Sequence, residues 1–141
     1  MANALHVDIV APDKRVFQGE ARGISAPGVG GSFEIRYNHA PMIAAIGIGT
    51  LVLAQDARET ITFATSGGFV EVIGNVVTVL AETVEHASDI DVDRARAAEE
   101  RARERLAAAD SSVDRARAER ALERARNRTR VAMGRVGTRA G

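Results

Sequence analysis

The fold is decided by the stretch Phe69–Leu80, which reads FVEVIGNVVTVL. On either side of Gly74-Asn75 the apolar side chains recur with a period of two, as in a β-strand. Glycine and asparagine tolerate the left-handed backbone that a two-residue hairpin turn requires. The stretch therefore predicts two neighbouring antiparallel strands joined by a tight turn.

The same period of two extends over the first 88 residues. Leu5, Val7 and Ile9 alternate with polar residues, and short apolar runs recur up to Leu80. Turn residues separate these runs, so breaks are expected at Gly47 and at Ser66–Gly68. About ten short strands at this spacing predict an antiparallel β-sandwich or flattened barrel.

After Ser88 the period changes to that of an α-helix, which predicts a boundary between a β-domain, residues 1–88, and a helical domain, residues 89–141. Asp89 or Asp91 is suited to cap a first helix, and Ser111 a second one. Helices are expected at about 91–109 and 112–133, with Gly134 as the stop and residues 135–141 as a loose tail. A short turn between the helices indicates an antiparallel helical hairpin. The apolar stripes are Ala95, Ala98, Ala102, Leu106 and Ala109 on the first helix, and Ala118, Leu122, Ala125, Thr129 and Ala132 on the second.

These stripes consist mostly of alanine, which has consequences for the hairpin. At about 0.8 kcal/mol per buried CH₂ group, an alanine seam gains much less from burial than a leucine seam. The helices themselves are strong by propensity. We therefore expect a hairpin that opens, swings out or packs on another protein.

Composition excludes several kinds of site. The chain has 141 residues, 45% apolar and 27% charged, with no cysteine, so disulfides, thiolate zinc sites and a cysteine nucleophile are excluded. Its three histidines stand far apart, and no apolar run reaches the roughly 20 residues of a membrane-spanning helix. The net charge of zero divides into −4 for residues 1–88 (5 basic, 9 acidic) and +4 for residues 89–141 (14 basic, 10 acidic).

Four segments in order resemble signatures of one family, the epsilon subunit of the bacterial F-type ATP synthase. The first ends in the tripeptide His39-Ala40-Pro41, and the last, IDVDRA, opens the predicted hairpin. The resemblance extends from about His6 to Arg128. The segments are Gly31–Pro41, Ser66–Val72, Asn75–Glu82 and Ile90–Ala95.

The resemblance implies a non-catalytic rotor subunit on the cytoplasmic face of the bacterial plasma membrane. In this family the β-sandwich binds the gamma subunit and rests on the ring of c subunits. The hairpin either folds down or extends into the catalytic head of alpha and beta subunits, where it restrains ATP hydrolysis. Such a subunit helps to couple proton translocation to ATP synthesis, and it is held at the membrane through the complex.

The resemblance also implies residues that contact these partners. Those expected to face the c-ring or gamma are Ser32, Glu34, Tyr37, Asn38, His39, Ala40 and Pro41. Ser32 stands where the family commonly has an acidic residue, and Glu34, two positions on, shares its face of a strand. Arg124, Arg126 and Arg128 are expected to meet acidic segments of the head.

No cofactor is required by the resemblance, but some members bind a regulatory ATP on the hairpin. The corresponding positions here are Ile90, Asp91, Arg94, Ala95, Arg124 and Arg128. Arginine forks suit phosphate oxygens. Glu82 matches a further acidic contact, although two extra residues separate it from Ile90.

The residues give less support to other functions. No nucleophile or carboxylate stands at a recognisable spacing from His39, so the sequence offers no set of residues for catalysis. The arginine-rich helices raise nucleic-acid binding as an alternative, but acidic residues interrupt them and no aromatic residue lies after Ser88 to stack on bases. A free-standing β-sandwich adaptor with a mobile hairpin remains the other alternative.

Overall fold

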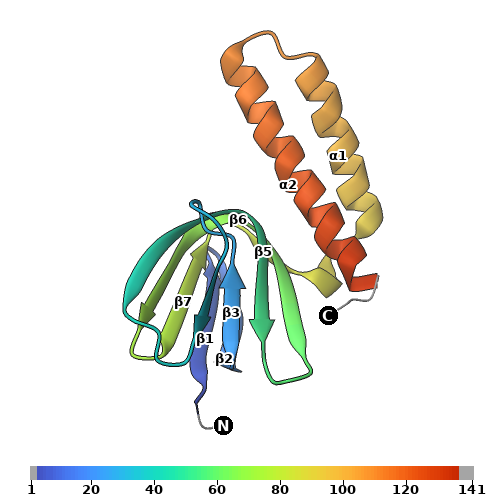
Figure 1. Cartoon of the computed structure of the whole chain (residues 1–141). Helices are drawn as coiled ribbons and strands as arrows, with labels where there is room; N and C mark the ends of the chain where they lie inside the picture. The colour runs from blue at the N-terminus through green and yellow to red at the C-terminus, as the bar shows by residue number, and fades with distance from the viewer. Residues whose placement is uncertain (1–2, 137–141) are drawn as a thin grey trace. The chain divides into compact units, whose positions relative to one another are not determined.

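In a computed structural model, which describes residues 3–136, the chain forms eight strands, one 3-10 helix and two α-helices (Figure 1). It divides into two compact units between His86 and Ala87. In chain order the elements are β1 (Leu5–Ala11), β2 (Lys14–Ala21), β3 (Gly23–Ala26), β4 (Phe33–Arg36), β5 (Met42–Ala54), β6 (Thr60–Ile73), β7 (Val76–Ala81), β8 (Val84–His86), η1 (Ala87–Asp89), α1 (Val92–Ala107) and α2 (Ser112–Val136).

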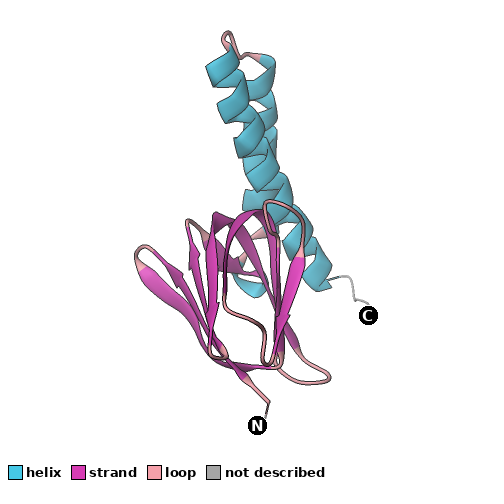
Figure 2. Ribbon diagram, turned by 60° about the vertical axis from the view of Figure 1, so that its left-hand side comes forward, coloured by secondary structure: helices cyan, strands magenta, loops and turns pink. Residues whose placement is uncertain are grey.

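The strands form one sheet that folds over into two layers (Figure 2). Their order is β2-β1-β7-β6-β5-β3-β4, and β8 pairs with the first half of β6. All pairs are antiparallel except β1 with β7. The predicted class, an antiparallel β-sandwich followed by a helical hairpin, is confirmed.

The eight strands are fewer than the ten expected, because two predicted breaks are bends within long strands. β5 continues through Gly47, and β6 continues through Ser66–Gly68. The two strands stay paired from Met42↔Val72 to Ala54↔Thr60. Gly67 and Gly68 have φ values of +127° and +138°, which other residues rarely adopt. Glycine here lets a strand turn from one layer into the other without ending.

The hairpin predicted from Phe69–Leu80 is confirmed. Ile73 pairs with Val76, and the turn residues Gly74 and Asn75 have φ values of +56° and +65°. Both values lie in the left-handed region that a type I′ turn needs.

The core of the β-unit lies between the two layers. Its largest fully buried side chains come from both layers, and Phe63 is the largest of them. The Phe63 ring makes edge-to-face contacts with the rings of Phe17 and His86. Ring centroids are 6.4 Å apart in the first pair and 5.3 Å in the second. The other large side chains of this core are Leu5, Val7, Ile9, Ile24, Ile35, Leu51, Leu53, Val70, Val72, Val77 and Val79.

The helical unit has the predicted caps and seam. Asp91 caps α1, and the Ser111 Oγ accepts a hydrogen bond from the Asp114 amide at 3.1 Å. In the seam, Ala95 and Ala132 are fully buried, and the other stripe residues are buried or half-buried. Two further residues of α2, Asn127 and Val131, are buried but were not part of the predicted apolar stripe.

The ends of the helices differ from the prediction. α1 ends at Ala107, and α2 continues through Gly134 to Val136. Gly134 does not adopt the positive φ of a helix-terminating glycine. Its lack of a side chain is therefore not used to stop the helix. Of the predicted tail, residues 137–141 lie outside the described residues.

Replacing Gly68 by alanine tests the bend in β6. A Cβ at this position would lie 2.0 Å from the Leu80 carbonyl oxygen, and φ is +138°. We expect Gly68→Ala to lower the free energy of unfolding, measured in urea, by about 2–3 kcal/mol. Gly30→Ala is the control, because a Cβ at Gly30 meets nothing within 4 Å. Equal stability of the two variants would contradict the tight approach of β6 and β7.

Candidate functional site

The motif Ile90–Ala95 forms the start of α1. The Asp91 Oδ1 accepts a hydrogen bond from the Arg94 amide at 3.1 Å, and the Asp91 carbonyl accepts one from Ala95. Ile90 is 2% exposed and Ala95 is fully buried. The two apolar members therefore anchor the helix start, Asp91 caps it as predicted, and the Arg94 side chain is exposed.

The three arginines predicted to contact the nucleotide or the catalytic head, Arg124, Arg126 and Arg128, lie in the second half of α2. Arg124 and Arg126 are exposed, whereas Arg128 is half-buried. The Arg126 Nε lies 3.8 Å from the Glu99 Oε2, which also receives the Arg103 Nη2 at 2.7 Å. Arg126 thus already has an acidic neighbour on α1.

The antiparallel register of the hairpin decides which of these residues come together. The Arg96 Nη2 approaches the Met133 Sδ at 3.6 Å, and Arg126 pairs with Glu99. With a rise of about 1.5 Å per residue, Arg128 lies roughly 7 Å along the helix axis from the level of Arg94. Arg124 lies one turn further away. The fold therefore brings Arg94 and Arg128 to the same end of the hairpin, with Arg124 nearer its middle.

Glu82 belongs to the β-unit, directly after β7. Its amide donates to the Gly67 carbonyl at 2.9 Å, and its side chain is exposed. The predicted nucleotide residues are therefore divided between the two compact units.

The predicted partner contacts divide between the two ends of β4. Ser32 is exposed and precedes the strand, whereas the loop Tyr37–Pro41 follows it. Glu34 lies on β4, where its Oε2 is 3.2 Å from the Arg36 Nη2. In the loop, the Nδ1–H of His39 donates to the Ala40 carbonyl at 2.8 Å. His39 thus orders the loop through its ring as well as through its amide, which donates to the Arg36 carbonyl.

An exposed apolar face on β5, β6 and β7 was missed from the sequence. Phe69 pairs with Leu80 and Ile73 with Val76, and their neighbours Val70, Val72, Val77 and Val79 are fully buried in the core. The five large side chains of this outer apolar face are Ile43 (72% exposed), Phe69 (57%), Ile73 (56%), Val76 (46%) and Leu80 (54%). The signal was present, since the outward positions of Phe69–Leu80 are apolar except for Glu71 and Thr78. Apolar residues on both faces are typical of a strand covered on both sides.

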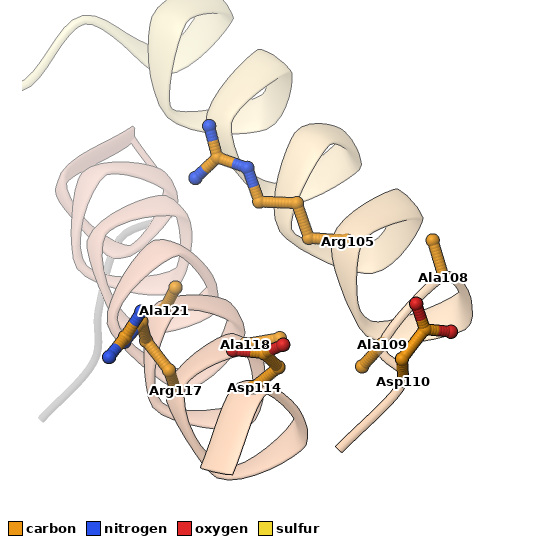
Figure 3. A pocket seen from close by; sticks show the side chains of 8 residues that line it. All are labelled: Arg105, Ala108, Ala109, Asp110, Asp114, Arg117, Ala118 and Ala121. Carbon is orange, nitrogen blue, oxygen red and sulfur yellow. The ribbon is translucent and has the colours of Figure 1, made fainter. Parts of the chain in front are cut away.

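A cavity of about 420 Å³ lies at the tip of the hairpin (Figure 3). In the figure Arg105 extends from α1, while Asp114 and Arg117 come from the start of α2. The lining residues are Arg105, Ala108, Ala109, Asp110, Asp114, Arg117, Ala118 and Ala121. None of the predicted site residues lines it, since Asp91 and Arg94 lie at the other end of α1.

The pKa of Asp56, in the β5–β6 loop, is lowered because its carboxylate accepts hydrogen bonds from the Arg58 amide at 2.8 Å and the Glu59 amide at 2.9 Å. This carboxylate shapes a turn. Within the described range no three acidic or histidine side chains gather as metal ligands. Nor does any helix in that range have the length and apolar character needed to cross a membrane.

Comparison with solved structures supports the fold. A chain of the mitochondrial ATP synthase of Euglena gracilis, from a structure of its OSCP/F1/c-ring, superposes with a TM-score of 0.76 at 21% identity, covering 87% of this chain and 78% of the other. A chain of the central stalk/c-ring of the Tetrahymena thermophila mitochondrial ATP synthase gives 0.64 at 14% identity, covering 91% and 96%. At these identities the likeness shows the fold alone.

Sequence comparison shows the family. An ATP synthase epsilon chain from Salinibacter ruber is 59% identical over 147 residues, covering 99% of each chain. One from Nitratidesulfovibrio vulgaris is 47% identical, covering 93% of this chain and 97% of the relative. Residues 4–87 match the ATP synthase, Delta/Epsilon chain, beta-sandwich domain, and residues 88–133 match the ATP synthase, Delta/Epsilon chain, long alpha-helix domain. The chain therefore belongs to the ATP synthase delta/epsilon family, as the four signature segments predicted.

Proposed function

We propose that the chain is a non-catalytic epsilon subunit in the central stalk of a bacterial F-type ATP synthase. Its β-unit links gamma to the c-ring, and its hairpin restrains ATP hydrolysis in the alpha/beta head. In this role it lies at the cytoplasmic face of the plasma membrane, held there through the complex. The observation that carries the proposal is the outer apolar face, which needs a protein partner.

The outer apolar face is the docking surface for gamma in this proposal. Five large apolar side chains are exposed on three adjacent strands, with the polar pair Glu71–Thr78 between Phe69–Leu80 and Ile73–Val76. Exposed apolar side chains gathered on one face mark interaction sites. A rotor subunit must stay attached to the stalk while the rotor turns, which favours a largely apolar, permanent interface. Relatives at 59% and 47% identity are ATP synthase epsilon chains. The family resemblance implies gamma, rather than a second copy of this chain, as the occupant.

Two groups of predicted contacts then serve two partners. Ser32 and Glu34 lie at or near the start of β4, and the loop Tyr37–Pro41 lies beyond its end. Four strand residues span about 13 Å. We assign Ser32 and Glu34 to the c-ring. The loop, which adjoins the β6–β7 turn, is assigned to gamma.

The hairpin acts through the arginines in the second half of α2. Arg124 and Arg126 are exposed, and guanidinium groups on a rim suit an acidic partner surface. Because the seam between α1 and α2 is mostly alanine, opening the hairpin exposes little apolar area. The two-state behaviour of such a hairpin requires only a small free-energy difference between its states.

Regulatory ATP is proposed at the end of the hairpin where Arg94 and Arg128 come together. The two residues differ by about 7 Å in axial level, and guanidinium groups on long side chains starting there suit the phosphate oxygens of one triphosphate. The outlying position of Arg124 gives it a lesser part than these two. Glu82 belongs to the other unit, and its contribution depends on how the two units are arranged.

Truncating the outer apolar face tests gamma docking. We expect Phe69→Ala and Leu80→Ala each to weaken binding to the gamma subunit by about tenfold or more, measured by calorimetry with the full chain. Val113→Ala removes a similarly exposed apolar side chain (64%) from the helical unit and should leave binding unchanged. Wild-type affinity in both sheet variants would mean that gamma docks elsewhere.

Charge reversal on α2 tests inhibition. The triple variant Arg124→Glu, Arg126→Glu, Arg128→Glu should raise ATP hydrolysis by the reconstituted head at least about fivefold over that with wild type. The triple variant Arg115→Glu, Arg117→Glu, Arg120→Glu carries the same charge change nearer the start of α2. Helix content measured by circular dichroism shows whether either variant unfolds. Equal hydrolysis with both triple variants would remove the specific role of the second half of α2.

Calorimetric titration with ATP, with and without magnesium, tests the nucleotide proposal. We expect saturable binding to the wild type and at least about a tenfold loss in Arg94→Ala and in Arg128→Ala, since each removes a charged phosphate contact. Arg117→Ala, at the other end of α2, is the control. Absence of binding to the wild type would leave Asp91 as a helix cap and end the proposal of an ATP sensor.

A further inference from the structure

Two turns that are far apart in sequence are joined by a reciprocal pair of asparagines. The Asn38 amide donates to the Asn75 Oδ1 at 2.6 Å, and the Asn75 Nδ2 donates to the Asn38 Oδ1 at 3.1 Å. In addition, the His6 amide donates to the Asn75 carbonyl at 2.9 Å. The β4–β5 loop, the β6–β7 turn and the start of β1 therefore meet at Asn75.

Backbone geometry alone does not explain why both positions carry an amide. Asn38 and Asn75 each have a φ of +65°, a conformation that glycine adopts at lower cost. Glycine at position 75 would satisfy its turn but lose both hydrogen bonds between the side chain of Asn75 and the loop. Glycine at position 38 would lose only the bond to the Asn38 Oδ1, because the other bond is donated by the backbone amide. The side chains, not the turns, require asparagine here.

The bridge lies where two proposed contact regions adjoin. Asn38 is part of the loop Tyr37–Pro41, and Tyr37 is 42% exposed. Asn75 lies between Ile73 and Val76, which belong to the outer apolar face. Fixing Asn38 to Asn75 thus fixes the loop to the edge of that face.

We propose that the Asn38–Asn75 bridge is a positioning device that presents the loop Tyr37–Pro41 and the outer apolar face to gamma as one preformed surface. The proposal rests on the docking of gamma described above. A loop that is ordered before binding does not lose that conformational freedom on binding, so the affinity is higher. Asn38 and Asn75 act through the loop and need no contact with gamma themselves.

A double-mutant cycle tests the bridge, with Asn38→Gly, Asn75→Gly and the double variant made in the full chain. Because glycine keeps the positive φ, each single variant should fold. Asn75→Gly removes both hydrogen bonds and should weaken gamma binding by about five- to tenfold, whereas Asn38→Gly removes one and should weaken it less. The double variant should bind no more weakly than Asn75→Gly, since that substitution alone already removes both hydrogen bonds. Amide exchange in the free protein should become faster over residues 37–41 in all three variants.

Asn3→Gly is the matched control. Asn3 also has a positive φ, of +61°, but its side chain makes no hydrogen bond within residues 3–136. Gamma binding should be unchanged in this variant.

The outcomes separate this inference from the one on which it rests. If the wild type does not bind gamma, both the docking of gamma on the outer apolar face and the positioning role of the bridge are contradicted. If the wild type binds and the glycine variants bind equally well, or if the two single effects add in the double variant, the bridge has no positioning role and gamma docking stands. A lower urea midpoint with unchanged gamma binding would likewise reduce the bridge to a structural contact and overturn the proposal.

Discussion

The β-unit depends on the close approach of β6 to β7 at Gly68. A single methyl group there would collide with the Leu80 carbonyl oxygen, at 2.0 Å. This approach lets β6 pair with β7 in one layer and with β8 in the other. Since β5 stays paired with β6 through the bend, both layers and the core between them follow from it.

The bend also determines which surface remains for a partner. Beyond Gly68, β6 presents Val70 and Val72 to the core and Phe69 and Ile73 to the outside. Strand alternation requires that one set of apolar residues point away from the core. A sequence that only had to fold would place polar residues there, as most antiparallel sheets do. Folding alone therefore does not explain the apolar side chains on the outer face. Binding to a permanent partner would explain them.

The sequence predicted the features that depend on neighbouring residues. The Gly74-Asn75 turn, the cap at Asp91 and the alanine stripes are each encoded within a few positions, and the structure has them as expected. Gly67 and Gly68 were misread as a break because a bend and a break share the same local signal. Only the pairing of β6 with β5 on both sides of the bend distinguishes them. The Asn38–Asn75 bridge joins residues 37 positions apart, and no local pattern encodes such a contact.

In the helical unit the local structure is strong and the tertiary contact between the two helices is weak, whereas the β-unit depends on contacts between distant residues. Each helix has its own cap, and exposed ion pairs such as Arg103 with Glu99 support α1 from within. Between the helices, a leucine at a seam position would bury about three more carbons than alanine, or roughly 2 kcal/mol per position. The helices therefore keep their shape at little cost when the seam between them opens. A rod that is locally stable and loosely paired is suited to a regulator that must change partners without unfolding.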